Sequence, residues 1–126
     1  MAMRDQGTMR EPNAAELNRR IKIRIRADAP ASDMGLDPIF TEEKRRWARI
    51  QPVGTVVYSA GVQTENRITH RVTLYYLDGV SDAHEVLHGV TLYRVRRVTD
   101  MNGNRRFTVL EVEELGPEKV GGGIYV

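Results

Sequence analysis

The sequence predicts an all-β protein, built as a small antiparallel six-stranded β-barrel with long loops and at most one short helix. Six short segments have the composition or the alternation of β-strands, and turn signals separate them at close spacing. No segment shows a sustained helical repeat. The pattern is typical of a small antiparallel barrel or sandwich. We expect a barrel at residues 19–115, between an N-terminal arm (1–18) and a C-terminal tail (116–126).

The N-terminal residues 1–18 contain few large apolar side chains. Such a segment cannot offset the entropy lost on ordering, so we expect a flexible arm. Pro12 is well placed for the first turn of a short helix within residues 11–18. The first strand is predicted at residues 20–27, because three isoleucines alternate there with basic residues. Its outer face is expected to be cationic and to consist of Lys22, Arg24 and Arg26.

Residues 28–41 are predicted to form a long loop, because they show no periodicity and contain two prolines and a glycine. Loops of this length in a small domain are usually functional or disordered. A second strand is predicted at residues 45–51, which include the only tryptophan, Trp47. Residues 53–66 mix strand-forming valines with glycines and are left as irregular structure with at most one helical turn.

The C-terminal half is predicted to be a meander of strands. The first of these covers residues 68–76. Asp78-Gly79, directly after it, is the strongest short-range hairpin signal in the chain. A short strand at residues 85–88 ends at Gly89.

A longer strand is predicted at residues 90–98. Its alternation changes phase, and a bulge near Arg96-Arg97 would restore it. Asn102-Gly103 predicts a further hairpin turn before the last strand, at residues 107–112.

A barrel needs one filled interior face, and the apolar residues of the alternating strands are the candidates for it. His70 shares its strand face with Val72 and Leu74, so we expect it to be a structural, hydrogen-bonded histidine. The predicted core consists of Ile21, Ile23, Ile25, Trp47, Val72, Leu74, Tyr93 and Val95.

Composition and motifs exclude several classes of protein. Without cysteine, the chain cannot form a disulfide scaffold, a thiolate zinc site or a cysteine nucleophile. No apolar run approaches the roughly 20 residues that span a bilayer, and the N-terminus does not resemble a secretory signal. No nucleophile elbow, phosphate loop or dinucleotide motif occurs. We therefore expect no enzymatic activity, no cofactor, no small-molecule substrate and no membrane association.

The histidines are the remaining candidates for metal binding. His84 and His88 are four residues apart and share a face on either a helix or a strand. A zinc site needs at least three protein ligands, and Glu85 would point to the opposite face of a strand. Two ordinary loop histidines are therefore favoured, and no metal site is predicted.

The net charge is only +2, but basic residues are concentrated at residues 19–26, 44–49 and 94–106. On alternating strands these clusters could form a cationic surface that binds nucleic-acid backbones through counterion release. Solvated or protein-facing charge that protects sheet edges is favoured, because stacking aromatics are scarce. The residues that could face DNA are Arg24, Arg26, Arg96, Arg97, Arg105 and Arg106.

A series of short motifs occurs in one order over residues 19–115. It comprises a basic strand (20–26), a long loop, a Trp-Ala-x-Ile-Gln-Pro strand (47–52), a Thr-His-Arg opening (69–71), a strand ending in Tyr75-Tyr76, a short strand before Gly89, a Tyr-x-Val core (93–95) and a strand closing on Glu114-Leu115. In this order the segment resembles the phage head–tail joining family, also called head-closure or stopper proteins.

The resemblance implies a non-enzymatic barrel that assembles as a homo-oligomeric ring beneath the portal and its adaptor. Such a ring closes the DNA-filled capsid of a tailed phage or prophage, docks the tail proteins and can contact packaged DNA non-specifically. The protein would lie in the virion, and in the host cytoplasm during assembly. The alternative is a small basic β-barrel that binds nucleic acid, for which binding to short duplex DNA should weaken steeply with salt.

The 28–41 loop and the 116–126 tail are rich in Gly, Pro and Asp but carry isolated apolar residues. We expect these segments to become ordered against neighbouring subunits or other virion proteins during assembly. The predicted contact residues are Met34, Leu36, Ile39, Phe40, Ile124, Tyr125 and Val126.

Overall fold

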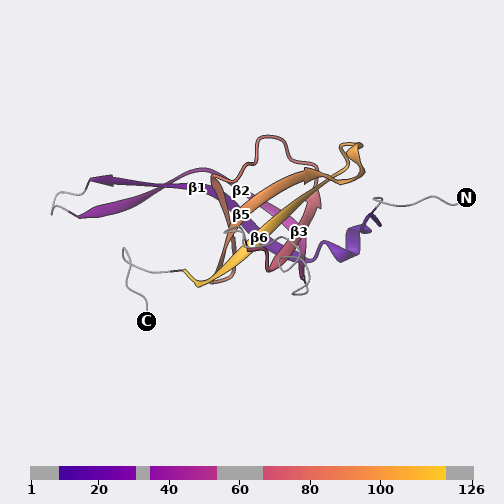
Figure 1. Ribbon diagram of the computed structural model, residues 1–126, viewed down its shortest axis with the longest axis horizontal. Coiled ribbons are helices and arrows are strands. Elements are labelled where there is room, and N and C mark those ends of the chain that lie inside the picture. The colour runs from indigo at the N-terminus through magenta and orange to yellow at the C-terminus, as the bar shows by residue number, and fades with distance from the viewer. Residues whose placement is uncertain (1–8, 31–34, 54–66, 119–126) are drawn as a thin grey trace, which may run out of the picture.

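The computed structural model describes residues 9–30, 35–53 and 67–118 (Figure 1). Six β-strands and two short 3₁₀ turns make up the regular structure of these residues, which confirms the predicted all-β class. The elements are η1 (Ala14–Glu16), β1 (Arg19–Pro30), β2 (Leu36–Pro52), β3 (His70–Tyr75), β4 (His84–His88), β5 (Thr91–Asp100), η2 (Met101–Gly103) and β6 (Phe107–Pro117). Within the described ranges, no helix has the length and apolarity needed to cross a membrane.

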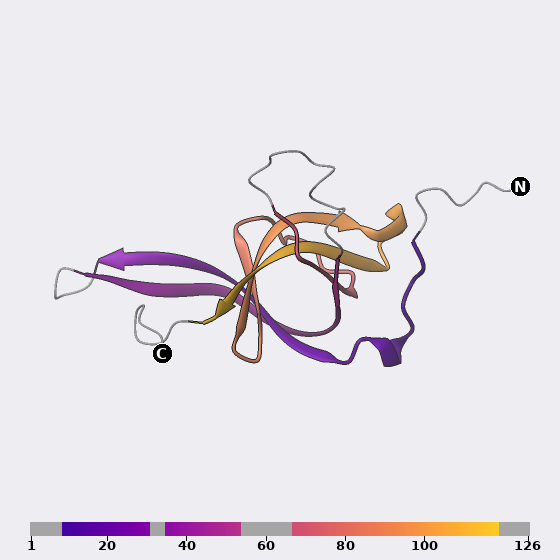
Figure 2. The same ribbon diagram turned by 60° about the horizontal axis from the view of Figure 1, so that its bottom comes forward.

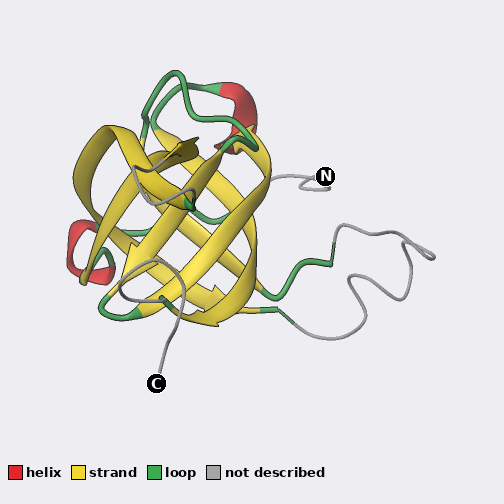
Figure 3. Cartoon of the chain, turned by 90° about the vertical axis from the view of Figure 1, so that its left-hand side faces the viewer, coloured by secondary structure: helices red, strands yellow, loops and turns green. Residues whose placement is uncertain are grey.

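The strands form one closed antiparallel barrel in the order β1-β2-β3-β6-β5-β4 (Figure 3). The sheet closes where β1 pairs with β4, from Lys22 opposite Leu87 to Ile25 opposite His84. A closed sheet leaves no edge strand in the barrel wall. The predicted barrel is therefore confirmed.

The two predicted hairpin turns differ in outcome. Asp78-Gly79 is a turn, but it connects β3 to β4, and these strands pair with other neighbours. The hairpin prediction is wrong there, because a turn sequence reverses the chain locally without deciding which strands pair. Asn102-Gly103 does join a paired hairpin, β5 and β6. The register of that pair shifts between Val95 and Arg97, which confirms the predicted bulge.

The predicted 28–41 loop is wrong for the residues that the structure describes. β1 continues to Pro30, which pairs with Leu36 at the start of β2. β4 pairs with β1 only as far as Ile25, so in the described part of the chain the outer β1–β2 ribbon has no further strand beside it and extends away from the barrel (Figures 1 and 2). Proline is tolerated on such a free edge, because no further strand needs its missing N–H. We call residues 26–30 and 35–41 the projecting hairpin.

The barrel interior is filled by apolar side chains from all six strands. Most of the predicted core positions are confirmed, including the paired isoleucines of β1. The buried core consists of Ile21, Ile23, Ala48, Val72, Leu74, Val86, Tyr93, Val95, Leu110 and Val112.

Two predicted core residues are wrong. Trp47 is 51% exposed, because Ala48 takes the interior position opposite Leu74 and alternation then turns Trp47 outward. The guanidinium carbon of Arg20 lies 5.3 Å from the centre of the Trp47 ring. Ile25 is only half-buried, at the point where β1 leaves the barrel.

The part of the N-terminal arm that is described packs across the outside of the barrel. Leu17 is 5% exposed and belongs to an outer apolar cluster with Met101, Phe107 and Val109. The Met9 N–H donates to Asn102 Oδ1 at 2.8 Å, and Asn102 Nδ2 donates to the Met9 carbonyl at 2.9 Å. The predicted helical turn is present as η1. Residues 9–18 are therefore anchored, where the sequence predicts flexibility.

Candidate assembly surfaces

The projecting hairpin presents apolar side chains to solvent. Leu36 is 64% exposed and Ile39 is 46% exposed. Phe40 is instead half-buried, since its ring centre lies 3.7 Å from the guanidinium carbon of Arg24. The remaining predicted contact residues, Met34, Ile124, Tyr125 and Val126, lie outside the described residues. Leu36 and Ile39 are therefore the apolar contact candidates that the structure places.

Arg24 lies on the outer side of β1 at the root of the hairpin, yet it is only 4% exposed. Its Nε donates to Glu85 Oε2 at 2.8 Å, and its Nη2 donates to Glu118 Oε2 at 2.5 Å. Burial alone would lower the pKa of Arg24, but the hydrogen bonds to Glu118 and Glu85 raise the pKa overall. We call Arg24, Phe40, Glu85 and Glu118 the Arg24 cluster. The prediction of Arg24 as an exposed, DNA-facing residue is wrong, because these side chains enclose it.

His84 also belongs to the root of the hairpin, and its prediction as an ordinary loop histidine is wrong. It begins β4 and is 4% exposed. Its Nδ1 accepts the Ser81 N–H at 3.1 Å, so Nε2 carries the proton that faces Glu42 Oε1 at 3.3 Å. Glu42 adopts a φ of 56° where the β1–β2 register shifts. The His84–Glu42 contact ties the hairpin root to the barrel, and the Ser81–His84 hydrogen bond holds the His84 ring within the β3–β4 turn.

The other histidines lie on strands β3 and β4. His70 is half-buried, its Nδ1 lies 2.9 Å from Thr69 Oγ1, and its ring meets Tyr93 edge-on at 5.2 Å. These contacts suit the predicted structural role of His70. His88 is half-buried at the end of β4. In the part of the chain that is described, no three His, Asp or Glu side chains gather as a metal site would require.

Most of the remaining candidate DNA-facing arginines lie beside carboxylates. The ion pairs are Arg26–Asp28 at 3.2 Å, Arg96–Glu113 at 2.6 Å, Arg97–Glu111 at 3.9 Å and Arg106–Glu11 at 3.3 Å. Arg105 is exposed, and its backbone N–H donates to Asp100. Pairing reduces the positive potential that these residues offer to a nucleic acid. Their contact with DNA stays a prediction.

Aromatic side chains lie on the outside of three adjacent strands, Trp47 on β2, Tyr75 on β3 and Phe107 on β6. Arg20 pairs in register with Trp47, and Tyr75 pairs with Phe107. The Tyr75 and Phe107 rings stack at 5.3 Å with an interplanar angle of 22°. Trp47 and Tyr75 are about half exposed, at 51% and 52%. No local signal in the sequence separates the two faces of β2 at this point, because Trp47 and Ala48 are adjacent and either could point inward.

A cavity of about 200 Å³ separates the N-terminal arm from the outer face of β2 and β3. We call it the arginine groove, because Arg10, Arg49 and Arg71 contribute three guanidinium groups to its lining. The other lining residues are Met9, Pro12, Gln51, Thr73 and Met101. Arg49 belongs to the basic cluster at residues 44–49 and Arg71 to the Thr-His-Arg motif, but no binding site is predicted from the sequence at these residues or at Arg10.

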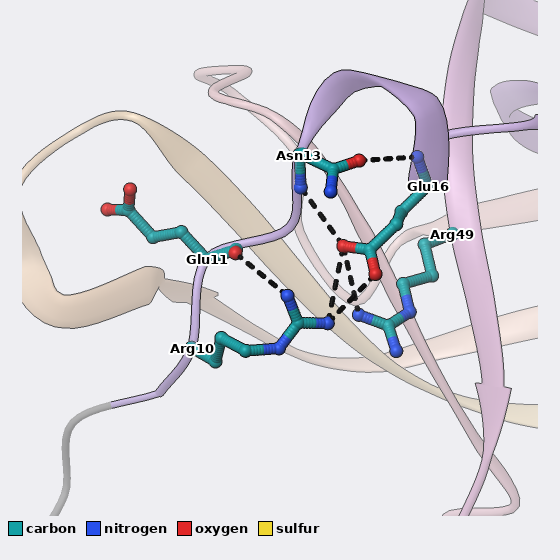
Figure 4. Close-up of polar contacts among 5 residues, drawn as sticks. All are labelled: Arg10, Glu11, Asn13, Glu16 and Arg49. Atoms are coloured by element: carbon teal, nitrogen blue, oxygen red, sulfur yellow. Dashed lines mark hydrogen bonds and ion pairs between the residues drawn. The ribbon is translucent and has the colours of Figure 1, made fainter.

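Glu16 is the carboxylate on the arm side of the groove (Figure 4). Its Oε1 accepts the Asn13 N–H at 3.0 Å and its own N–H donates to Asn13 Oδ1 at 3.2 Å, which forms a capping box around η1. Arg10 Nη2 donates to both carboxylate oxygens, at 3.2 and 3.0 Å, while Arg49 Nη1 lies 3.7 Å away. The hydrogen bonds from Arg10 and Asn13 lower the pKa of Glu16.

Comparison with known proteins identifies a matching family and a solved structure with a related fold. The model of the family described as phage head completion protein matches residues 12–115. A protein of Shigella flexneri 2a with a known solution structure has a similar fold, with a TM-score of 0.61 and 13% sequence identity. The similarity covers 82% of this chain and 97% of that protein. No protein with a curated description matches this chain.

Proposed function

The chain belongs to the phage head completion protein family, and on this basis we propose that it closes the DNA-filled head and docks the tail. It is a structural protein of the phage virion. In the proposed role, several copies form a ring beneath the portal and its adaptor. The role is one of assembly, and the exposed arginines such as Arg97 and Arg105 would meet packaged DNA only non-specifically.

The projecting hairpin is the observation that supports this proposal most directly. A closed barrel has no edge strand in its wall, so it cannot join another subunit by extending its sheet there. Among the described residues, in contrast, no further strand pairs with the outer β1–β2 ribbon beyond Ile25, and the ribbon exposes Leu36 and Ile39. Such a ribbon suits a head-to-tail contact, in which one surface of each copy binds a different surface of the next and the chain of contacts closes into a ring.

Complementation of a phage that lacks this protein tests the proposal. We expect capsids made without the protein to fill but to lose DNA or to remain without tails. The double variant Leu36→Ser, Ile39→Ser should fold, because both side chains are exposed, and should reproduce this defect. Electron microscopy of the particles and the infectious titre measure the outcome.

Val90→Ser is the matched control, since Val90 is 72% exposed but lies in the turn between β4 and β5. Its particles should keep their DNA and their tails. Intact, infectious particles from a phage without the protein would contradict the proposed function. Intact particles with the hairpin variant alone would instead remove the hairpin from the joining surface.

A further inference from the structure

The arginine groove carries more positive charge than its carboxylates balance. The Glu16 carboxylate accepts two hydrogen bonds from Arg10, and its Oε1 lies 3.7 Å from Arg49 Nη1. One carboxylate therefore faces two guanidinium groups. Glu111 stands opposite Arg71 in the β3–β6 register, but its carboxylate lies 3.9 Å from Arg97. Among the described residues, Arg71 has no ion pair.

Arg71 is also the one described residue with a fully buried side-chain polar atom that lacks a hydrogen-bond partner. That atom is its Nε, and the side chain as a whole is half-buried. A guanidinium N–H that is removed from water and meets no acceptor is costly, and most native structures avoid it. Arg71 lines an open groove and its side chain is only half-buried, so an acceptor that enters the groove would meet the exposed part of that side chain. To bond the Nε as well, the side chain would have to turn toward the groove.

We propose that the arginine groove binds a carboxylate side chain of a neighbouring virion subunit. The fork of N–H donors on Arg71 matches the two oxygens of a carboxylate, and Arg49 adds a second positive charge. Aliphatic side chains of Met9, Pro12 and Met101 complete the lining and suit the methylene groups of an acidic residue. Assigning the ligand to another virion subunit rests on the proposed function, whereas the anion site itself does not.

A protein carboxylate fits this place better than a DNA phosphate. The N-terminal arm forms one wall of the groove. A single side chain can enter a recess of about 200 Å³, whereas the phosphates of a duplex lie on a rigid rod and meet exposed charges first.

Titration of the arginine side-chain N–H signals by NMR tests the site on the full chain. The probes are a tri-glutamate peptide, inorganic phosphate and a short DNA duplex. We expect the peptide to shift the Nε–H signals of Arg71 and Arg49 and to saturate. Arg71→Lys should weaken peptide binding about tenfold, because it keeps the charge but loses the fork. Arg94→Met, which removes an exposed charge on β5, should leave the binding unchanged.

Two outcomes would overturn the site as proposed. One is an Arg71 signal that does not respond to the peptide. The other is saturation by phosphate or the duplex at lower concentration than by the peptide, which would assign the groove to phosphate groups.

Complementation separates this inference from the proposed function. We expect Arg71→Met to reduce the infectious titre and Arg94→Met to leave it unchanged. In one contrary outcome, the hairpin variant gives no infectious particles while Arg71→Met gives a normal titre. That result would reject the neighbouring subunit as the ligand of the groove and would leave the head-closure role supported. If a phage without the protein is fully infectious, both the head-closure role and the binding of a neighbouring subunit are rejected. The peptide titration then decides on its own whether the anion site exists.

Discussion

Arg24 on β1 and Arg71 on β3 are both outward-facing arginines of one barrel, separated by β2, but their surroundings are opposite. Arg24 is enclosed by Phe40 and bonded to two carboxylates, Glu85 and Glu118. Arg71 lies in a groove with a buried Nε that has no partner. The difference indicates that Arg24 holds the structure together, whereas Arg71 is available to bind. Arg24 is also the more buried of the two residues, and the acceptors around each guanidinium group explain the difference in role.

The largest effect should come from Arg24→Met. It leaves Glu85, which is 8% exposed, as a buried carboxylate without its cation, so we expect a loss of about 3–5 kcal/mol in the free energy of unfolding. Urea denaturation measures the loss. Adding Glu85→Gln to the variant removes the unpaired charge and should restore part of the stability. A loss below about 1 kcal/mol would show that the Arg24 cluster is not structural.

Leu17→Ala should have the next largest effect on the free energy of unfolding. It tests how the N-terminal arm, which forms one wall of the arginine groove, is held on the barrel. Leu17 is 5% exposed in the outer apolar cluster, so its truncation should cost about 2–3 kcal/mol. Hydrogen exchange of the arm amides should accelerate more than that of β3 or β6, because the arm alone loses its anchor. Leu115→Ala is the control, since Leu115 is 50% exposed. Equal stability of the two variants would mean that the arm does not depend on Leu17.

Arg71→Met sharpens the comparison with Arg24 directly. No hydrogen bond or ion pair is lost, and methionine retains most of the aliphatic contact of the side chain. We expect the free energy of unfolding to change by less than about 1 kcal/mol. Urea denaturation beside Arg24→Met gives the comparison under one set of conditions. Similar losses for both variants would remove the distinction between a structural and a binding arginine.

The elements with a purely local signal could be predicted from the sequence. The alternating isoleucines of β1 determine both the strand and its inward face at Ile21 and Ile23. On β2 the signal is ambiguous, because Trp47 and Ala48 are adjacent and either could point inward. The larger side chain suggested the wrong face. The projecting hairpin could not be predicted, since prolines and aspartates favour loops until the pairing of two long strands overrides them.

The two arginine environments depend on tertiary contacts, which no local pattern contains. Arg24 is buried by residues that follow it by 16, 61 and 94 positions, namely Phe40, Glu85 and Glu118. The arginine groove requires both the β2–β3 pairing and the packing of the arm. Counting basic residues therefore located the clusters but could not tell which guanidinium groups would find acceptors.

The smallest expected effect concerns Glu16, the carboxylate that faces Arg10 and Arg49. Hydrogen bonds from Arg10 and the Asn13 N–H lower its pKa below the ordinary value of 4.5, so the stabilisation of η1 is present above pH 4.5 and is lost as the pH falls through the lowered pKa. An NMR titration of the Glu16 side chain should give a midpoint below 4.5, and Arg10→Gln should move it upward, because the largest cause of the shift is removed. An unchanged Glu16 midpoint would mean that Arg10 does not hold this carboxylate. Glu16 would then be free to pair with Arg49, and the excess positive charge of the groove would rest on Arg10 and Arg71.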